Sequence, residues 1–329
     1  MENFIKYVHI NNFKSIADLT LEDCKRINLF IGCPNVGKSN ALEALSLFSL
    51  PYLNEGENIN RLIRAENKNG LFFDNSINAC SVRSNNNSVE LNTDSFIIRN
   101  QSTGTEKQFF LSTELSTDTD IDNREGYWET SVKRYMFHAN QHWFSNNAIS
   151  LSQPFGENMM DVLLNNPDIS EVNAWIKREL AKIGFEYLLD TTHNTIKIQR
   201  QLSDNKVKQL PYSSLSETLQ RIIFYKTVIA SNKNSILLFK EPEAQIFPPY
   251  IQTIMQDIID AKSSQFFIAT YSPLAVNAFL EYEKLRKETS IYLFGYQDNQ
   301  TTAKRLSNEE IELAYEYSDD LFFNLENLL

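Results

Sequence analysis

The sequence predicts an α/β fold with a mixed sheet, plus an inserted lobe that is rich in β-strands and helices. Three stretches of the chain support this prediction. An apolar run, a glycine-containing loop and a helix-like segment follow one another over residues 27–50. Apolar runs alternate with amphipathic segments again after residue 215, a pattern typical of strands and the helices that cover them. The polar, irregularly patterned middle of the chain separates these two parts and predicts the inserted lobe.

Composition limits the classes of protein to which the chain can belong. Of its 329 residues, 42% are hydrophobic and 22% are charged, as in ordinary globular domains. No apolar run approaches the roughly 18 residues of a membrane span, and the first residues lack the apolar core of a signal peptide. Cys24, Cys33 and Cys80 are too few and too scattered for a disulfide framework. We therefore expect a cytoplasmic protein without a membrane partner.

The charge of the chain bears on nucleic acid as a partner. A formal net charge of −11 argues against a surface broadly devoted to nucleic acid, because phosphate backbones attract cations. It leaves room for a local basic groove. The four histidines are scattered and show no metal-ligand spacing. Nucleic acid is thus a possible partner that the overall charge does not indicate.

Residues 1–65 are expected to form the N-terminal part of the α/β domain. Residues 5–10 and 19–21 are short β-type runs, and residues 27–31 are an apolar run of the kind found in buried strands. Residues 39–50 carry apolar side chains at helical spacing and stop before Pro51. The residue before a proline is disfavoured in a helix, so a helix is expected to end there.

The rest of the chain divides into three parts. Residues 66–150 hold short alternating runs between clusters of Asn, Ser, Thr and Asp, which predicts a β-rich insertion. Residues 151–205 predict a helical and hairpin insertion, with a helix over 157–185 whose apolar face holds Trp175, Ile176 and Leu180. Residues 206–329 are expected to form the C-terminal part of the α/β domain. Helices are predicted there over 215–230, 250–261 and from Pro273, and strands over 235–239, 265–270 and 291–295.

Residues 32–39 match the pattern G-x-x-x-x-G-K-[ST] of a P-loop in full. Glycines let such a backbone wrap around phosphate oxygens, and its amides form an anion nest at a helix N-terminus. Lys38 is expected to reach the β- and γ-phosphates and the Ser39 hydroxyl to bind Mg²⁺. The sequence therefore predicts a site for ATP and Mg²⁺. Its residues are Gly32, Cys33, Pro34, Asn35, Val36, Gly37, Lys38, Ser39 and Asn40.

Three further segments follow about 200 residues later. Residues 211–220 contain Ser214-x-x-Glu217, a capping-box pattern that predicts a helix N-terminus. Such a terminus can receive a phosphate, although a plain capped surface helix explains this stretch equally well. Residues 236–243 are an apolar strand with an acidic tip, as a Walker B strand requires. Residues 265–273 have the form of a strand that ends in a polar switch loop. This order after a P-loop is hard to obtain by chance.

In these motifs the chain resembles the SMC-like, ABC-type ATPases, particularly the OLD-like group common in bacterial anti-phage defence. Val8-His-Ile10 with Asn12-Phe-Lys-Ser-Ile16 is similar to the N-terminal signature of that family, and Gly37-Lys-Ser-Asn40 with Leu42-Glu-Ala-Leu45 is similar to its P-loop helix. Residues 211–273 match in order its signature motif, Walker B motif and histidine switch. The resemblance implies an ABC-type ATPase head that dimerises head-to-tail. Ser216, Glu217 and Thr218 would then face the nucleotide of the partner.

Three positions depart from the pattern of that family. Its members usually carry Asp before the catalytic Glu, His in the switch and Gly in the signature motif, where this chain has Lys240, Tyr271 and Thr218. A charged lysine cannot bind a cation, which puts the Mg²⁺ site in doubt. Glu241 remains at the position that would orient or deprotonate the attacking water. Loss of one oriented group commonly costs about 10²–10³ in rate. We therefore expect ATP to bind and to be hydrolysed slowly or not at all, the alternative being an active enzyme with permitted variants.

The resemblance implies a nucleotide-gated sensor or regulator in a bacterial defence system. It would act as a homodimer or higher homo-oligomer with a separately encoded effector. Two alternatives stay open: a pseudo-ATPase scaffold that holds ATP and organises or traps an effector, and a DNA repair or recombination ATPase. The chain ends too soon after residue 295 for a Toprim nuclease domain, so no nuclease activity is assigned. The Q-loop is not located, with Gln101 and Gln141 as candidates, and His138 and His142 are interpreted as packing or loop residues.

Overall fold

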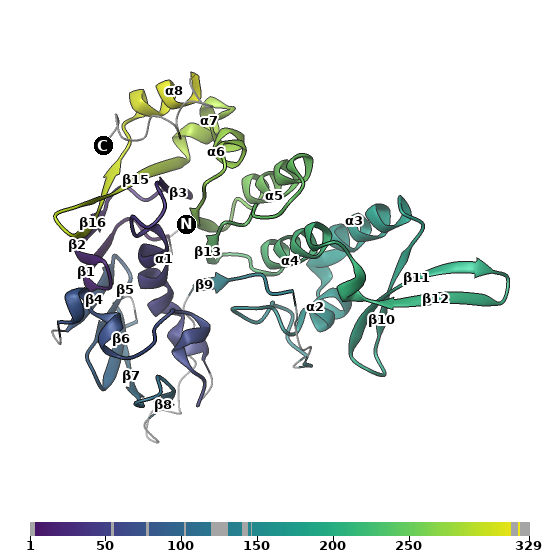
Figure 1. The fold of residues 1–329 in the computed structure, drawn as a ribbon, viewed down its shortest axis with the longest axis horizontal. Coiled ribbons are helices and arrows are strands. Elements are labelled where there is room, and N and C mark those ends of the chain that lie inside the picture. The colour runs from purple at the N-terminus through teal and green to yellow at the C-terminus, as the bar shows by residue number, and fades with distance from the viewer. Residues whose placement is uncertain are drawn as a thin grey trace. The chain divides into compact units, whose positions relative to one another are not determined.

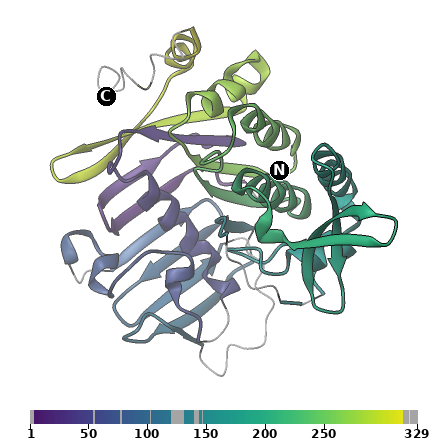
Figure 2. The same cartoon turned by 45° about the vertical axis from the view of Figure 1, so that its right-hand side comes forward.

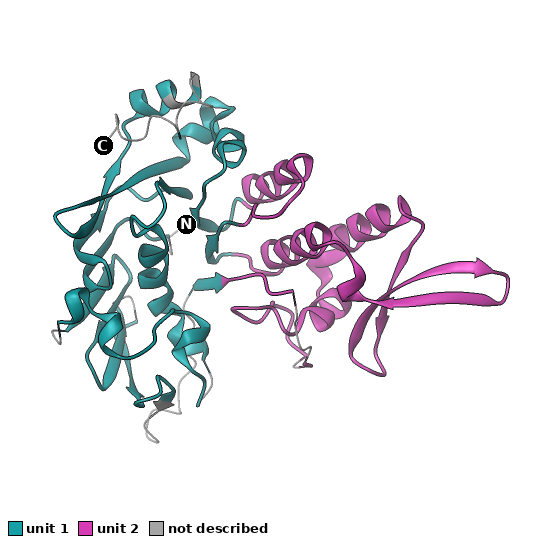
Figure 3. Ribbon diagram, viewed as in Figure 1, with its two compact units in different colours: residues 1–134, 234–241, 262–329 teal, residues 135–233, 242–261 magenta. Residues whose placement is uncertain are grey.

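The computed structural model (Figure 1) describes residues 4–53, 56–76, 79–101, 103–119, 131–139, 144–145, 147–316 and 322. The chain forms two compact units, which Figure 3 colours separately. Unit 1 consists of Met1–Arg134, Asn234–Glu241 and Lys262–Leu329, and unit 2 of Tyr135–Lys233 and Pro242–Ala261. Among the described helices, none has the length and apolar character needed to span a membrane.

A six-stranded mixed sheet forms the centre of unit 1. Its strands lie in the order β16-β15-β3-β14-β13-β9. The neighbours β15, β3, β14 and β13 pair in parallel, and β16 pairs with β15 antiparallel. Every residue of β3 and β14 is buried, as expected of parallel strands that are covered on both faces. The bounds are β3 (Ile27–Gly32), β9 (Val132–Tyr135), β13 (Ile236–Lys240), β14 (Gln265–Ala269), β15 (Thr289–Gln297) and β16 (Gln300–Arg305).

A seven-stranded antiparallel sheet forms the other layer of unit 1 and is seen as the purple and blue strands in Figure 2. Its order is β2-β1-β4-β5-β6-β7-β8, so the first hairpin of the chain continues into the strands of residues 80–119. Buried and half-exposed residues alternate along β1, which gives the sheet one core-facing side. The bounds are β1 (Val8–Phe13), β2 (Ile16–Leu21), β4 (Cys80–Ser84), β5 (Asn87–Leu91), β6 (Ser95–Asn100), β7 (Thr105–Leu111) and β8 (Thr117–Thr119).

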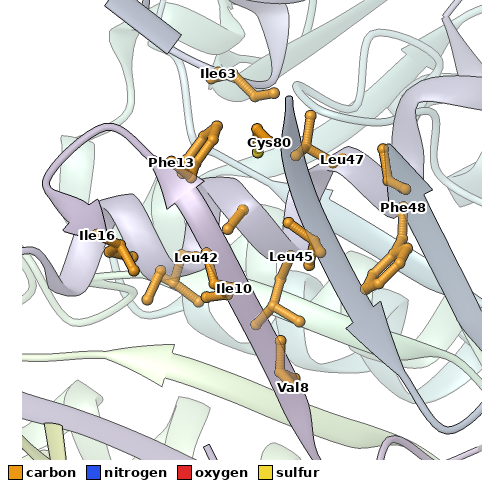
Figure 4. Packing of buried hydrophobic residues seen from close by; sticks show 14 of the residues in the cluster. Val8, Ile10, Phe13, Ile16, Leu42, Leu45, Leu47, Phe48, Ile63 and Cys80 are labelled. Atoms are coloured by element: carbon orange, nitrogen blue, oxygen red, sulfur yellow. The ribbon is translucent and has the colours of Figure 1, made fainter. Parts of the chain in front are cut away.

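Helix α1 (Lys38–Ser46) is held in the core of unit 1. It contacts β3, β13 and β14 of one sheet and β1 of the other. Figure 4 shows Leu42 and Leu45 of α1 beside Val8 and Ile10 of β1, and these four side chains are almost completely buried. A helix that is covered on several sides cannot shift without exposing apolar surface. The α-helix ends at Ser46, before the predicted end, and continues as the 3₁₀-helix η1 (Leu47–Tyr52), which contains Pro51.

The remaining helices of unit 1 are short. Three single 3₁₀ turns lie between α1 and β4, namely η2 (Ile59–Arg61), η3 (Asn69–Leu71) and η4 (Phe73–Asn75). Helix α6 (Pro273–Leu280) begins where the sequence predicted, because the Ser272 hydroxyl accepts a hydrogen bond from the Ala275 amide and Pro273 occupies the first turn. Helices α7 (Glu283–Lys287) and α8 (Asn308–Glu316) follow.

Unit 2 combines four α-helices, two 3₁₀ turns and a three-stranded sheet among its described residues. Helix α4 (Glu217–Ser231) contacts α2 (Met159–Asn165), α3 (Ser170–Ala181) and α5 (Pro248–Asp260). The sheet has the order β10 (Glu186–Asp190), β11 (Thr195–Ser203) and β12 (Lys206–Pro211), and it is antiparallel throughout. The 3₁₀ turns are η6 (Pro167–Ile169) and η7 (Tyr212–Ser214).

The helix predicted over residues 157–185 is two helices, α2 and α3, and α3 ends at Ala181. Asn166 separates them with an extended backbone, the conformation that a following proline imposes. Its side chain accepts a hydrogen bond from the Asp168 amide and so starts η6. Trp175, Ile176 and Leu180 are buried on one side of α3, as the apolar spacing predicted.

Candidate functional site

Two glycines fix the path of the loop between β3 and α1. Gly32 has φ 144°, and a Cβ atom there would lie 2.4 Å from the carbonyl oxygen of Phe294 in β15. Gly37 has φ 99°, and a Cβ atom there would lie 2.0 Å from the Oγ1 of Thr301 in β16. Both conformations are unfavourable for residues with a side chain. The two glycine positions of the motif pattern therefore coincide with two places where this backbone has no room for a Cβ atom.

The first turn of α1 presents its backbone amides at the end of this loop. The first helical hydrogen bond runs from the Ala41 amide to the Gly37 carbonyl, so the amides of residues 38–40 have no acceptor within the helix. Ser39 is half-buried beside them. Cys33, Pro34 and Asn35 are exposed, whereas Val36 is buried. Free amides at a helix N-terminus are the geometry that binds phosphate.

Lys38 points back into the loop. Its ammonium donates hydrogen bonds to the carbonyl oxygens of Gly32 at 2.6 Å and of Cys33 at 2.7 Å. The Nζ atom also lies 4.0 Å from the centre of the Tyr271 ring, a distance at which a cation is attracted to the ring face. Only 4% of Lys38 is exposed. The Lys38 ammonium is thus held by two carbonyl oxygens of the loop and by the Tyr271 ring.

Burial disfavours the charged form of Lys38. It lowers the pKa of this side chain to about 8, against the opposing effects of Cys33 and Glu241 and with a smaller contribution from the positive charge of Lys240. A lysine with such a pKa is partly neutral in mildly alkaline solution. An added anion beside the ammonium would raise the pKa again, because a nearby negative charge stabilises the charged form.

The ends of β13 and β14 bring three further predicted residues to this edge of the sheet. Parallel strands place their carboxyl ends at one edge, and β3, β14 and β13 are consecutive neighbours. Lys240 is the last residue of β13, and Glu241 follows it with φ 48° and donates its amide to the Ala269 carbonyl. The Lys240 ammonium lies 3.7 Å from the Glu241 carboxylate. Tyr271 follows β14, and burial together with the charge of Glu241 raises the pKa of its hydroxyl.

A hydrogen-bond chain supports the loop from the side of β16. The Ser15 hydroxyl lies 2.7 Å from the Thr301 hydroxyl, and the Asn40 amide group donates to Ser15 Oγ at 2.7 Å. The Thr301 backbone amide donates to the Ser15 carbonyl. Ser15 thus links the β1–β2 turn, β16 and the first turn of α1. Sequence reasoning noticed Ser15 only as part of a family signature and missed Thr301 altogether, because no local pattern marks a residue whose role is to lie beside Gly37.

A buried ion cluster fixes α1 one turn further on. The Glu43 carboxylate is fully buried and forms an ion pair with Lys14 and another with Arg64, at 2.8 Å from the Arg64 Nε. The Arg134 guanidinium lies 3.8 Å from the same carboxylate. Burial opposes the charge on Glu43, but the neighbouring cations outweigh it and lower the pKa of this carboxyl. Breaking such a buried pair would leave an uncompensated charge, which is strongly destabilising.

The predicted signature residues lie in unit 2. Ser216, rather than Ser214, is the N-cap of α4, and its hydroxyl accepts a hydrogen bond from the Leu219 amide at 3.4 Å. Glu217 pairs with Arg221 one turn along the helix. Thr218 donates its hydroxyl to the Gln245 carbonyl at 3.0 Å. Helix α4 therefore begins at Glu217, two residues after the predicted start at 215, and its cap lies two residues after the one that the capping-box pattern indicated.

Four candidates of the sequence analysis remain, namely Gln101, Gln141, His138 and His142. Gln101 is exposed in the turn that follows β6. His138 packs against Phe155 in unit 2, with 5.9 Å between the ring centres. Gln141 and His142 lie outside the described residues.

The residues at the edge fit a polyphosphate better than they fit a tightly held metal ion. The glycine-lined loop, the amides of α1 and Lys38 are donors for phosphate oxygens. For Mg²⁺, the Ser39 hydroxyl is a suitable oxygen, but Lys240 at the end of β13 carries an ammonium, which cannot bind a cation. Within the described parts of the chain, no three His, Cys, Asp or Glu side chains are grouped as a metal site.

No protein-family model matches the sequence. An uncharacterized protein of Methanocaldococcus jannaschii is similar over a short stretch, with 48% identity over 44 residues. This stretch is 13% of the present chain and 20% of that protein. The chain therefore spans about a fifth of the length of the curated relative that it matches.

Solved structures of SMC heads are similar over nearly the whole chain. One is the SMC head bound to the C-terminal winged-helix domain of ScpA, with a TM-score of 0.53 and 15% identity over 93% of this chain and 99% of that chain. Another is an SMC head with an extended coiled coil from Pyrococcus furiosus, bound to the C-terminal domain of ScpA, with a TM-score of 0.55 and 13% identity over 95% of this chain and 98% of that chain. The α/β fold with a mixed sheet that the sequence predicts is thus confirmed as the fold of an SMC head, an ABC-type ATPase head.

Proposed function

We propose that this chain is a nucleotide-binding head of the SMC-like, ABC type that holds ATP and hydrolyses it slowly or not at all. The observation that carries the proposal is the loop of residues 32–39. Its two glycines have no room for a side chain, and the loop leads directly into the first turn of α1. The Lys38 ammonium donates a hydrogen bond back to the Gly32 carbonyl of this loop. Mg²⁺, where it binds with ATP, would neutralise phosphate charge, with Ser39 as the ligand supplied by the loop.

Binding of ATP requires Lys38 to change partners. In the structure its ammonium is satisfied by two loop carbonyls and the Tyr271 ring. Phosphate oxygens are stronger partners for an ammonium than neutral carbonyls, because a bond between two charged groups is roughly twice as strong. The exchange therefore favours the bound state. Tyr271 would have to give way to the terminal phosphate, which makes this side chain a sensor of whether the phosphate is present.

Slow turnover follows from the same edge of the sheet. Glu241 is the proposed group for orienting the attacking water, but its carboxylate is engaged by the Lys240 ammonium at 3.7 Å. Tyr271 covers Lys38 where the family has an imidazole. A phenol is neutral at physiological pH and cannot supply the charge of an imidazolium. Two substitutions, each at a position that touches the reacting phosphate, would together cost about 10⁴ or more in rate.

Assembly is the proposed output of nucleotide binding. Ser216, Glu217 and Thr218 would meet the nucleotide of a second copy in a head-to-tail homodimer or a higher homo-oligomer. The insertions of residues 66–150 and 151–205 would then present a surface for a separately encoded effector. The structural neighbours are solved in complex with ScpA, which supports a protein partner of some kind. The resemblance to OLD-like proteins supports a sensor or regulator in anti-phage defence.

A pseudo-ATPase scaffold is the second candidate, and Lys240, Tyr271 and Thr218 favour it. In this version ATP is a permanent structural element rather than a signal. The two candidates differ in whether nucleotide exchanges during function, because a sensor must release its ligand and a scaffold need not.

Copurification tests the proposal. Wild type, Lys38→Ala and the control Lys287→Ala would be purified in parallel, where Lys287 is exposed and paired with Glu283 on α7. Bound nucleotide is measured by ion-pair chromatography of the denatured protein, and size by light scattering. We expect wild type and the control to carry ATP and to assemble on ATP, and Lys38→Ala to do neither. Equal nucleotide content and equal size in all three proteins would contradict the proposal.

A further inference from the structure

The hairpin of β11 and β12 ends in an arm that takes no part in the core of unit 2. Residues 200–209 are all exposed, and Figure 1 shows β11 and β12 reaching beyond the helices of the same unit. The base of the hairpin is different, because Ile196 and Ile198 are buried there. The strands are thus anchored at one end. We call residues 200–209 the arm.

The arm is basic in an acidic protein. It holds three cations, Arg200, Lys206 and Lys208, and one anion, Asp204, so its formal charge is 3 − 1 = +2, whereas the whole chain carries −11. Two lysines elsewhere in this unit have carboxylate partners: the half-buried Lys197 pairs with Asp190, and the exposed Lys182 with Glu179. Within the described residues, the three cations of the arm have no carboxylate at ion-pair distance, and Arg200 contacts only the Phe185 ring, with 5.6 Å to its centre.

The strand register places these cations on one face. Arg200 of β11 is directly opposite Lys208 of β12, and opposite residues of an antiparallel pair point to the same side. Lys206 is two residues from Lys208 on β12 and shares that side, because the irregularity of the ladder lies on β11, between Gln201 and Ser203. Like charges directly opposite each other destabilise a β-ladder. Folding of the hairpin thus gains nothing from this arrangement, whereas an anion laid across the face would neutralise all three charges.

The other face of the arm and its base carries amide side chains. Gln199 and Gln209 are opposite each other, and Gln201 is opposite Val207. These amides form hydrogen bonds within the hairpin, from Gln209 to Gln199 and from Gln201 to the Ser203 carbonyl, so the cation face is the one that binds phosphates. The ribbon itself is narrow, since paired strands lie about 4.8 Å apart. The major groove of duplex DNA, about 12 Å wide, admits a two-stranded ribbon of this kind.

We propose that the arm binds the phosphate backbone of double-stranded DNA, with the ribbon in the major groove. Arg200, Lys206 and Lys208 then face the groove, where their long side chains reach the phosphates on its walls, and the amide face points away from the DNA. The major groove of duplex RNA is deep and too narrow for side chains to enter, so the arm distinguishes the two duplexes by shape. The arm belongs to unit 2 and uses no residue of the loop that holds Lys38, so this proposal stands apart from the proposed function.

Fluorescence anisotropy with a labelled 20-base-pair DNA duplex tests the arm at several salt concentrations, with the full chain and without nucleotide. The arm variant is Arg200→Gln/Lys206→Gln/Lys208→Gln. The control variant, Lys182→Gln/Lys262→Gln/Lys287→Gln, loses the same three charges at exposed positions that are paired with carboxylates. Each phosphate contact contributes about −0.9 to the slope of log K against log salt. We expect the arm variant to have a slope shallower by about 2.7 and at least tenfold weaker binding at low salt, and the control to bind like wild type.

Two further measurements sharpen the result. Because the arm variant relieves the repulsion between Arg200 and Lys208, its denaturant midpoint should equal or exceed that of wild type. A duplex RNA and polyglutamate are offered as competitors, and both should displace the DNA at least tenfold less well than unlabelled DNA does. The proposal is overturned if the arm and control variants lose affinity equally, if wild type fails to bind DNA at 50 mM salt, or if RNA or polyglutamate competes as well as DNA. A Lys38→Ala variant that keeps arm binding separates this result from the nucleotide site.

Discussion

Lys38 is a charged side chain held in a place that favours its neutral form. Two carbonyl oxygens and the face of Tyr271 surround its ammonium, and burial lowers its pKa to about 8. A phosphate requires the charged form. The free protein must therefore be protonated at Lys38 before or during the binding of ATP, and the affinity for ATP becomes linked to pH.

The sign of this linkage follows from the direction of the pKa shift. As pH rises through about 8, free Lys38 loses its proton, whereas Lys38 beside phosphate keeps it. Binding of ATP then takes up one proton, and the affinity should fall by up to tenfold per pH unit above pH 8. Below pH 7 the affinity should be independent of this group. Titration calorimetry between pH 6.5 and 9.5, in buffers of different ionisation enthalpy, measures both the affinity and the proton uptake.

A lysine-to-arginine exchange provides the matched control. Arginine stays protonated throughout this range, so Lys38→Arg should bind ATP with little pH dependence if it binds at all. Cys33→Ser removes the nearest thiol, and its affinity for ATP should still fall as pH rises, with the fall beginning at a lower pH because Cys33 raises the pKa of Lys38. A pH dependence that survives in Lys38→Arg and disappears in Cys33→Ser would assign the titration to Cys33 and refute the role of Lys38.

Among the elements, α1 and β16 determine the geometry of the loop. Helix α1 is covered by both sheets of unit 1, and β16 lies so close to Gly37 that Thr301 excludes any side chain there. The path of the loop therefore depends on β16, a strand that follows the loop by more than 260 residues in the sequence. A loop whose backbone is fixed before the ligand arrives loses little entropy on binding.

Substitution of Gly37 tests this arrangement. Gly37→Ala combines a φ of 99° with a Cβ atom 2.0 Å from Thr301 Oγ1, so it should lower the free energy of unfolding by about 3 kcal/mol or more and abolish ATP binding. Gly104→Ala is the matched control, because Gly104 has φ 68° and nothing within 4 Å of the added Cβ. It should cost only about 1 kcal/mol for the backbone conformation. Urea unfolding of the two variants gives the difference, and equal costs would show that the contact with β16 is unimportant.

The sequence predicts local elements well and long-range neighbours poorly. The apolar spacing and the glycines of residues 27–39 predict a strand, a loop and the start of a helix, and the structure has all three. Apolar side chains at helical spacing continue on both sides of Pro167, so the spacing alone predicts one helix. The proline divides this segment into α2 and α3. The motif pattern predicts Tyr271 as a switch position. Its contact with Lys38 is not recognisable, because it depends on the parallel order of β3 and β14.

At the scale of the whole molecule, the loop of residues 32–39 and the predicted signature residues belong to different units. The loop lies in unit 1, and Ser216, Glu217 and Thr218 lie in unit 2. In the proposed head-to-tail dimer, the exposed N-terminus of α4 would meet the phosphate of the partner, because the positive end of a helix dipole favours an anion. ATP would then link the two copies.

Two substitutions at Ser216 separate assembly from helix stability. Asp and Asn both cap a helix as well as Ser does, but only Asp adds a negative charge where the phosphate would lie. Ser216→Asn should therefore assemble on ATP like wild type, and Ser216→Asp should stay monomeric, while both bind ATP through the loop. Light scattering with and without ATP distinguishes them. If Ser216→Asp assembles as readily as Ser216→Asn, the helix end does not face a phosphate.

Phosphate release is the most direct test of the central claim that the chain holds ATP without turning it over. The assay uses saturating ATP and Mg²⁺ with wild type, Lys38→Ala as the background control, and Lys240→Asp/Tyr271→His, which restores a carboxylate and an imidazole to the edge of the sheet. We predict turnover below about 0.1 s⁻¹ for wild type, since usual enzymes reach about 10 s⁻¹ and each missing group costs about 10²–10³, and a rise of at least tenfold in the double variant. Wild-type turnover of about 1 s⁻¹ or faster, abolished in Lys38→Ala, would contradict the account.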